Sequence, residues 1–200
     1  MALTVDQKGN EESTMETGDR IGGRTRLCGL IGNPVEHTLS PLIHNTLALE
    51  CGCDMAYVPF LVEKGSLQDA VKGAYALNVL GMNVTVPYKT EVIPFLKSID
   101  PMAEAMESVN TLVRTEGGYR GYNTDMSGLY RAMREDGLAL LGERIAVIGA
   151  GGVGRAVAYL CAAKGAGQVV ILNRSLDKAE AVAAEVCAKT KRDVVRALPL

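Results

Sequence analysis

The sequence of 200 residues suits one large domain or two small ones, and with 48% hydrophobic and 22% charged residues it has the composition of an ordinary soluble globular protein. Its 21 basic and 23 acidic side chains give a formal net charge of -2 without a run of like charges. Neither nucleic acid nor a membrane surface is therefore indicated as a partner, and no apolar stretch reaches the roughly 18 residues that span a bilayer.

The N-terminal segment 1–26 is polar and lacks a hydrophobic signal region, so we expect a disordered extension and a cytoplasmic protein. The five cysteines have no metal-ligand spacing, and only two histidines could add ligands. This pattern predicts reduced thiols and no metal site.

Residues 27–32 form an apolar run typical of a buried parallel strand, and a proline-containing loop leads from it to an expected helix over 41–51. Ser40 is expected to cap this helix, with Pro41 as its first residue. Ser40 and Thr38 would then place two hydroxyls beside a helix N-terminus, a combination that favours an anion such as a carboxylate. Spacing alone leaves it equally open that Ser40 only caps the helix.

A strand over 54–60, a helix over 64–77 and a strand over 82–86 follow. This alternation predicts a parallel sheet with right-handed crossovers. In the last of these strands the polar residues Asn83 and Thr85 alternate with apolar ones, as in a strand with one buried face.

Pro87 is expected to end this strand and to open a helix over 88–96, with Lys89 in its first turn. Backbone N–H groups there disfavour an ammonium, so this lysine is either well solvated or poised for chemistry. Because ligands of parallel sheets bind beyond the carboxyl ends of the strands, Asn83, Thr85 and Lys89 predict a small-molecule site. For this segment alone, the alternative is a solvated lysine beside a half-exposed strand.

A helix over 100–106 and a hairpin over 109–123 come next, followed by a helix that runs to about residue 136. Asp125 falls in the first turn of that helix, where the helix dipole favours the carboxylate. Brought together, Asp125 and Lys89 would hold a proton donor beside its counter-charge. Alone, Asp125 fits the alternative of a plain acidic residue at a helix start.

Residues 137–142 look like a domain boundary, and a strand over 144–148 then leads into a glycine-rich loop and a helix that ends near residue 164. Six residues form the loop: Gly149, Ala150, Gly151, Gly152, Val153 and Gly154. They match the G-x-G-x-x-G dinucleotide-binding fingerprint in its required place between a strand and a helix. The glycines permit close approach of a pyrophosphate to the helix N-terminus, and a purely structural turn is the alternative.

The next strand, over 168–172, is followed by three polar residues: Asn173, Arg174 and Ser175. An NAD site carries an acid at this place for the ribose hydroxyl, whereas an arginine suits a 2′-phosphate, so NADP is favoured over NAD as the cofactor. Asp177 is the competing candidate for an acid that contacts the ribose hydroxyl. Its position, however, indicates the first turn of a helix over 177–189. Residues 193–200 are expected to begin a third strand.

The elements together predict an α/β fold. An α/β substrate-binding and catalytic domain over 27–137, including a linking helix, would precede a partial Rossmann (doubly wound) nucleotide-binding domain over 138–200.

In this order, the motifs resemble those of the shikimate dehydrogenase family over about residues 27–186. The resemblance is carried by GNPVEHTLSPLIHN (32–45), NVTVPYK (83–89), NT (110–111), GYNTD (121–125), and the glycine loop with NRS (173–175). It implies NADP-dependent, reversible reduction of 3-dehydroshikimate to shikimate in aromatic amino-acid biosynthesis.

The resemblance also implies roles for single residues. Lys89 and Asp125 would be the catalytic pair, and Thr38 and Ser40 would hold the substrate carboxylate. Four further side chains would approach the ring hydroxyls and the reacting centre: Asn83, Thr85, Asn110 and Thr124. The chemistry fits these roles, since hydride transfer to a ketone creates an alkoxide that an ammonium can stabilise and protonate.

Two features depart from the family pattern. Thr38 stands where the family usually has serine, and we expect its added methyl group either to alter the fit of the substrate or to favour a related acid such as quinate. The chain also stops at Leu200, before the second half of the nucleotide-binding domain, so we expect a C-terminally incomplete chain.

The alternatives are therefore a quinate/shikimate dehydrogenase, or a truncated shikimate-binding module without turnover. Another two-domain dehydrogenase with a catalytic lysine, such as the methylene-tetrahydrofolate type, is disfavoured by the Thr38 and Ser40 pair and by the segment Asn123-Thr124-Asp125. The expected partner is a small-molecule substrate, with the chain a monomer or a homodimer.

Overall fold

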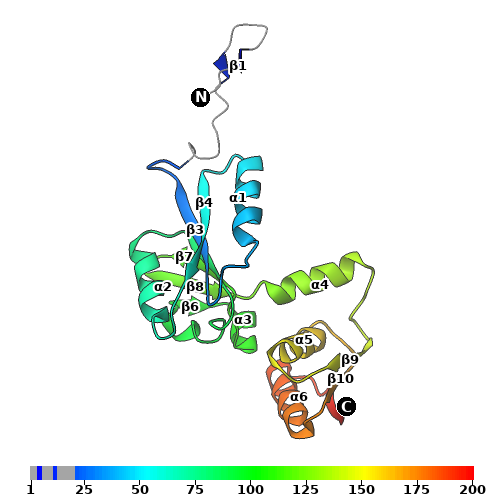
Figure 1. Cartoon of the computed structure of the whole chain (residues 1–200). Coiled ribbons are helices and arrows are strands. Elements are labelled where there is room, and N and C mark those ends of the chain that lie inside the picture. The colour runs from blue at the N-terminus through cyan, green and yellow to red at the C-terminus, as the bar shows by residue number, and fades with distance from the viewer. Residues whose placement is uncertain (1–3, 6–10, 13–20) are drawn as a thin grey trace. The chain divides into compact units, whose positions relative to one another are not determined.

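The computed structural model describes residues 4–5, 11–12 and 21–200 (Figure 1). The extension expected over 1–26 lies largely outside the described residues, so its disorder stays a prediction. Its described parts, β1 (Thr4–Val5) and β2 (Glu11–Glu12), pair antiparallel.

By its internal contacts the chain divides into two compact units. The first comprises residues 1–97 and 112–119, and the second comprises residues 98–111 and 120–200. The domain boundary near residue 137 stays a prediction.

Residues 26–122 supply a six-stranded sheet with the strand order β4-β3-β5-β7-β8-β6. Its strands are β3 (Arg26–Gly32), β4 (Met55–Leu61), β5 (Gly81–Val84), β6 (Ser98–Ile99), β7 (Thr111–Thr115) and β8 (Gly118–Tyr122). The helices of this part are α1 (Ser40–Glu50), α2 (Leu67–Ala76), α3 (Pro101–Met106) and the short 3-10 helix η2 (Ile93–Phe95).

Strand β3 lies inside the sheet, because it pairs in parallel with both β4 and β5. Its last four residues, 29–32, are all buried, which explains the unbroken apolar run in the sequence. Helix α1 runs alongside β4 (Figure 1). The predicted parallel strand-helix-strand-helix-strand order is confirmed, and it brings the carboxyl ends of β3, β4 and β5 to one edge.

The prediction of a helix over 88–96 is wrong. Residues 86–92 form turns, and only η2 is helical. Pro94 lacks the N–H that would continue an α-helix, and its ring disfavours helical geometry in Ile93. Lys89 therefore lies in a turn that follows β5, and the argument from a helix dipole does not apply to it.

The second unit contains a smaller, parallel sheet with the order β11-β10-β9. Its elements are α4 (Asp125–Glu135), β9 (Arg144–Ile148), α5 (Gly152–Ala163), β10 (Gln168–Asn173), α6 (Leu176–Thr190) and β11 (Val195–Pro199). Apolar residues of the sheet and of α5 and α6 form one core, which includes Val169, Ile171 and Leu140. The α/β fold with a partial Rossmann unit is confirmed.

Four charged side chains join α3 to α5 and α6 within the second unit: Glu107, Arg155, Glu185 and Lys189. The Lys189 Nζ also donates to the Ala105 carbonyl at 2.8 Å. The hydrogen bond and charge of Lys189 lower the pKa of Glu107. Since each cation meets two carboxylates, this network is stronger than isolated surface pairs.

Among the helices of the described part of the chain, none combines the length and the apolar character that a membrane span requires. The described residues also contain no group of three or more His, Cys, Asp or Glu side chains arranged to hold a metal ion. The five cysteines are free thiols, and burial raises the pKa of Cys28 and of Cys161.

Candidate functional site

The carboxyl ends of β3 and β5 lie directly beside each other. The Thr85 N–H donates to the Ile31 carbonyl at 3.0 Å, and the Asn33 N–H donates to the Val86 carbonyl at 3.0 Å. A Cβ at Gly32 would overlap the Thr85 side chain, so only glycine permits this close approach. The fold thus holds Thr85 at the strand end where parallel sheets bind ligands.

Helix α1 begins one residue earlier than expected, and the predicted capping role of Ser40 is wrong. Leu39 is the N-cap with helical dihedral angles, and Ser40 is the first helical residue. The reason is that the Ser40 N–H donates to the Thr38 Oγ1 at 3.2 Å. Thr38 thus accepts a hydrogen bond from a backbone N–H at the helix start, as the side chain of a cap residue would. The Ser40 hydroxyl is consequently available for another role.

Tyr57 of β4 is a residue that the sequence did not predict, and it contacts the predicted site at Asn83. Tyr57 is buried, and its Oη donates to the Asn83 Oδ1 at 2.7 Å. The signal in the sequence is weak, because a buried tyrosine needs a partner for its hydroxyl but no local pattern indicates which residue that is. One predicted substrate residue, Asn83, is therefore held by a side chain of another strand.

Burial raises the pKa of Tyr57 to about 12. The folded chain therefore keeps this proton while the unfolded chain loses it near pH 10, so the free energy of unfolding should fall as the pH rises from 10 to 12. Tyr57→Phe should remove on the order of 2 kcal/mol of that fall. Denaturant unfolding of both proteins across this range checks it, and equal slopes would contradict the assignment.

Lys89 is half-buried in the turn after β5, and its neighbour Tyr88 anchors that turn. Tyr88 is almost fully buried, its hydroxyl donates to the Val62 carbonyl at 2.6 Å, and its N–H donates to the Thr85 carbonyl at 2.9 Å. The backbone that carries Lys89 is therefore fixed relative to Thr85.

In the second unit, a single amide organises the predicted polar residues. Asn110 is buried, and its Nδ2 donates to the Asp125 Oδ1 at 2.6 Å. Its Oδ1 accepts three bonds, from the Thr124 N–H at 2.9 Å, the Thr124 hydroxyl at 3.1 Å and the Thr111 hydroxyl at 2.9 Å. The structure thus brings Asn110, Thr124 and Asp125 together, as the sequence predicts, and adds Thr111.

Asp125 is the first residue of α4. Its N–H donates to the Asn123 Oδ1 at 3.1 Å, and Asn123 in turn donates to the Ser108 carbonyl at 3.0 Å. The hydrogen bond from the Asn110 amide orients the Asp125 carboxylate. Asp125 is exposed, so this oriented carboxylate can interact with a cation or a hydroxyl from outside the unit.

The glycine loop is held to the end of β10 by two hydrogen bonds, and a third orients the amide that makes one of them. The Gly149 N–H donates to the Leu172 carbonyl at 2.8 Å, and the Ala150 N–H donates to the Asn173 Oδ1 at 3.3 Å. The Asn173 Nδ2 donates to the Ser175 carbonyl at 2.9 Å. Both ends of the Asn173 amide are therefore used to shape the loop.

The glycine loop is closely packed at Gly154 and open at Gly151 and Gly152. A Cβ at Gly154 would overlap the Gly149 carbonyl oxygen, whereas at Gly151 and Gly152 it would meet nothing within 4 Å. Val153 is 75% exposed. Backbone N–H groups in the first turn of α5 are thus open to an anion such as a pyrophosphate.

Arg174 is exposed directly after β10, and Asp177 lies in the first turn of α6, as expected. The two residues between β10 and α6 are Arg174 and Ser175, and neither is acidic. This arrangement suits a phosphate better than a free ribose hydroxyl pair.

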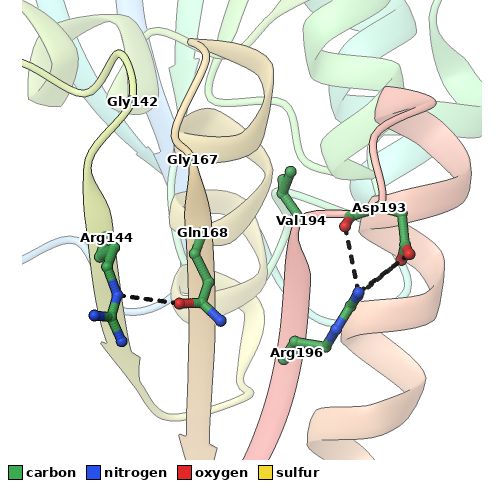
Figure 2. Close-up of a pocket in the computed structure, with 7 residues that line it drawn as sticks. All are labelled: Gly142, Arg144, Gly167, Gln168, Asp193, Val194 and Arg196. Atoms are coloured by element: carbon green, nitrogen blue, oxygen red, sulfur yellow. Dashed lines mark hydrogen bonds and ion pairs between the residues drawn. The ribbon is translucent and has the colours of Figure 1, made fainter.

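A pocket of about 390 Å³ lies at the opposite end of the same sheet (Figure 2). Arg144 and Gln168 begin β9 and β10 and bond to each other at 3.2 Å, while Arg196 bonds to Asp193 at 2.7 Å. Because these are the amino ends of the strands, this pocket is distinct from the glycine loop.

Two family models match the chain. One describes the shikimate dehydrogenase substrate binding domain and matches residues 30–112. The other describes shikimate / quinate 5-dehydrogenase and matches residues 132–198.

Shikimate dehydrogenase (NADP(+)) of Desulforamulus reducens is 44% identical over 172 residues, which are 86% of this chain and 59% of that protein. The chain thus spans less than two thirds of this relative.

Two crystal structures are similar to the chain. A shikimate dehydrogenase in complex with NADP+ has a TM-score of 0.81 and 38% identity, over 88% of this chain and 62% of that one. Shikimate 5-dehydrogenase from Listeria monocytogenes, in complex with shikimate and NAD, has a TM-score of 0.81 and 36% identity, over 91% of this chain and 63% of that one. Together with the two domain matches, these similarities show that the chain belongs to the shikimate dehydrogenase family.

Proposed function

We propose that the chain carries out the NADP-dependent, reversible reduction of 3-dehydroshikimate to shikimate. The observation that carries the proposal is the buried Asn110 amide, which holds the Asp125 carboxylate and Thr124 together at the start of α4 in a member of this family. The names of the relatives support the substrate and the cofactor.

Lys89 and Asp125 form the proposed catalytic pair. Hydride transfer to the ketone creates an alkoxide, and the Lys89 ammonium stabilises it and delivers a proton. Asp125, oriented by Asn110, provides the counter-charge that keeps the lysine in place. In the reverse direction the same lysine, as the neutral amine, accepts the hydroxyl proton.

The other polar residues position the substrate. Thr38 and Ser40 bind the carboxylate through their hydroxyls. Asn83, Thr85, Asn110 and Thr124 approach the ring hydroxyls and the reacting carbon. Holding the ring in this way supplies the orientation that hydride transfer requires.

NADP is the proposed cofactor, and when bound it supplies or accepts the hydride. The open first turn of α5, with Gly151 and Gly152, receives the pyrophosphate, and the glycine Cα atoms leave room for it. This loop is shaped by Gly149, Ala150, Val153 and Gly154. The 2′-phosphate would be held by Asn173, Arg174 and Ser175.

Arg174→Ala should weaken NADP binding by about 10- to 100-fold and leave NAD binding within about 2-fold, because a charge-assisted hydrogen bond contributes about 1.5–3 kcal/mol. Calorimetric titration with each cofactor measures the two effects. Arg144→Ala, at the other end of the sheet, is the matched control. Equal losses for NADP and NAD would refute the phosphate assignment.

A quinate/shikimate dehydrogenase is the second candidate. The methyl group of Thr38 and the description of the second family model support it. Steady-state rates with shikimate and with quinate under the same conditions distinguish the two candidates.

A shikimate-binding module without turnover is the third candidate. Formation of NADPH by the chain with shikimate and NADP, followed by absorbance, tests the enzyme directly. Turnover supports the proposed function, binding of shikimate without turnover supports the module, and absence of both contradicts the proposal. A small-molecule partner is part of the proposal, while the oligomeric state, as monomer or homodimer, and the cytoplasmic location stay predictions.

A further inference from the structure

The ladder of hydrogen bonds between β3 and β4 ends at a proline. The N–H of Val62, the residue that follows β4, donates to the Gly32 carbonyl at 3.1 Å. In a parallel ladder the next donor from β3 toward the Val62 carbonyl would be the N–H of residue 34. This residue is Pro34, which carries no N–H. Because Val62 is buried, its carbonyl needs a donor from elsewhere.

Two side chains supply hydrogen bonds to this carbonyl. The Tyr88 hydroxyl donates to the Val62 oxygen at 2.6 Å, and the Asn33 Nδ2 donates to the same oxygen at 3.3 Å. The tyrosine bond is the shorter one, and Tyr88 is only 1% exposed. The phenol therefore takes the place of the backbone donor that Pro34 lacks, and it connects the turn after β5 to the end of β4.

Tyr88 also holds the turn together from within. Among residues 85–91 it alone is buried, and it directly precedes Lys89. Its N–H donates to the Thr85 carbonyl at 2.9 Å, and its carbonyl accepts the Val92 N–H at 2.9 Å. These two bonds are local to the turn, whereas the hydroxyl bond to Val62 places the turn against another strand of the sheet.

We propose that Tyr88 is a positioning residue for Lys89, and that its hydroxyl bond to Val62 holds the proton-donating lysine at the carboxyl ends of β3, β4 and β5. The inference rests on the proposed function and adds to it a residue outside the predicted site. Tyr88 acts through the backbone that it shares with Lys89, because its own ring is buried. A displacement of a reacting group by about 1 Å can lower a rate by about 100-fold, so the anchor of this turn affects the chemical step.

Tyr88→Phe tests the inference, because it removes the hydroxyl and keeps the buried ring. Steady-state oxidation of shikimate with NADP should show a kcat lowered by about 10-fold or more, with the KM for shikimate within about 2-fold. The rates are measured well below the thermal midpoint of the variant, where a purely structural role of Tyr88 would leave kcat unchanged. A kcat within about 2-fold of that of the unchanged chain would overturn the inference.

Asn33→Ala is the matched control. It removes the other side-chain donor to the Val62 carbonyl but keeps the bond between Val62 and the turn, so kcat should stay within about 2-fold. Tyr119→Phe is a second control and should also keep its kcat, since Tyr119 is buried and its hydroxyl donates to the Val79 carbonyl at 2.8 Å, away from the turn. Equal losses of kcat in Asn33→Ala and Tyr88→Phe would assign the effect to the Val62 carbonyl alone and overturn the inference.

Failure of the proposed function is distinguishable from failure of this inference. If the unchanged chain does not oxidise shikimate, the proposed function is contradicted, and amide hydrogen exchange followed by NMR decides about Tyr88. The N–H groups of residues 88 and 92 donate to carbonyls of the turn. In Tyr88→Phe they should exchange about 3- to 10-fold faster, because the turn opens more often, and in Asn33→Ala and Tyr119→Phe their exchange should not change. Unchanged exchange in Tyr88→Phe would overturn the inference.

Discussion

Lys89→Ala should lower the rate of shikimate-dependent NADP reduction by about 10³-fold or more. The variant loses the group that protonates the alkoxide and stabilises its charge, and effects of these two kinds each reach about 10²-fold or more. Substrate binding should weaken much less, because Thr38 and Ser40 remain. Initial rates and calorimetric binding separate the two effects.

The fold of Lys89→Ala should be intact, since the buried Tyr88 anchors the turn. Its thermal midpoint should lie within about 2 °C of that of the unchanged chain. Lys72→Ala, on an exposed position of α2, is the control and should keep full activity. A Lys89→Ala rate near that of the unchanged chain would remove this lysine from the mechanism.

Gly154→Ala should have the second largest effect, on the second unit and on the cofactor. The new Cβ would overlap the Gly149 carbonyl oxygen, and Gly149 is tied to the Leu172 carbonyl through its own N–H at 2.8 Å. We expect a loss of about 3 kcal/mol in unfolding free energy and NADP binding weakened by about 100-fold or more. Thermal unfolding and cofactor titration measure these changes.

Gly128→Ala supplies the control for that experiment. Gly128 lies inside α4, and a Cβ there would meet nothing within 4 Å. This variant should gain about 0.5–1 kcal/mol of stability and keep its NADP affinity. Wild-type NADP binding by Gly154→Ala would contradict the account of the loop.

The sequence predicted the strands and helices over residues 144–190 almost residue by residue. The strand over 144–148 is observed without change, and the glycine loop and the helix after it lie where the fingerprint places them. Each of these signals is local, because periodicity and glycine positions act over a few residues.

Features that depend on contacts between distant residues were not predicted. The Tyr57 and Asn83 side chains are 26 residues apart, and no local pattern indicates their hydrogen bond. The helix expected over 88–96 failed because the proline at position 94 outweighs the helical pattern around it. The predicted residues Asn110 and Asp125 are joined, but the direction of the amide between them could be seen only in the structure.

The central claim is that Lys89 and Asp125 act on one hydroxyl of one substrate, and a crystal structure of the chain with shikimate tests it most directly. The account predicts that the Lys89 Nζ and a carboxylate oxygen of Asp125 both lie within about 3.2 Å of the same shikimate hydroxyl. Shikimate bound with either group turned away from that hydroxyl, or bound at another place on the chain, would contradict the claim.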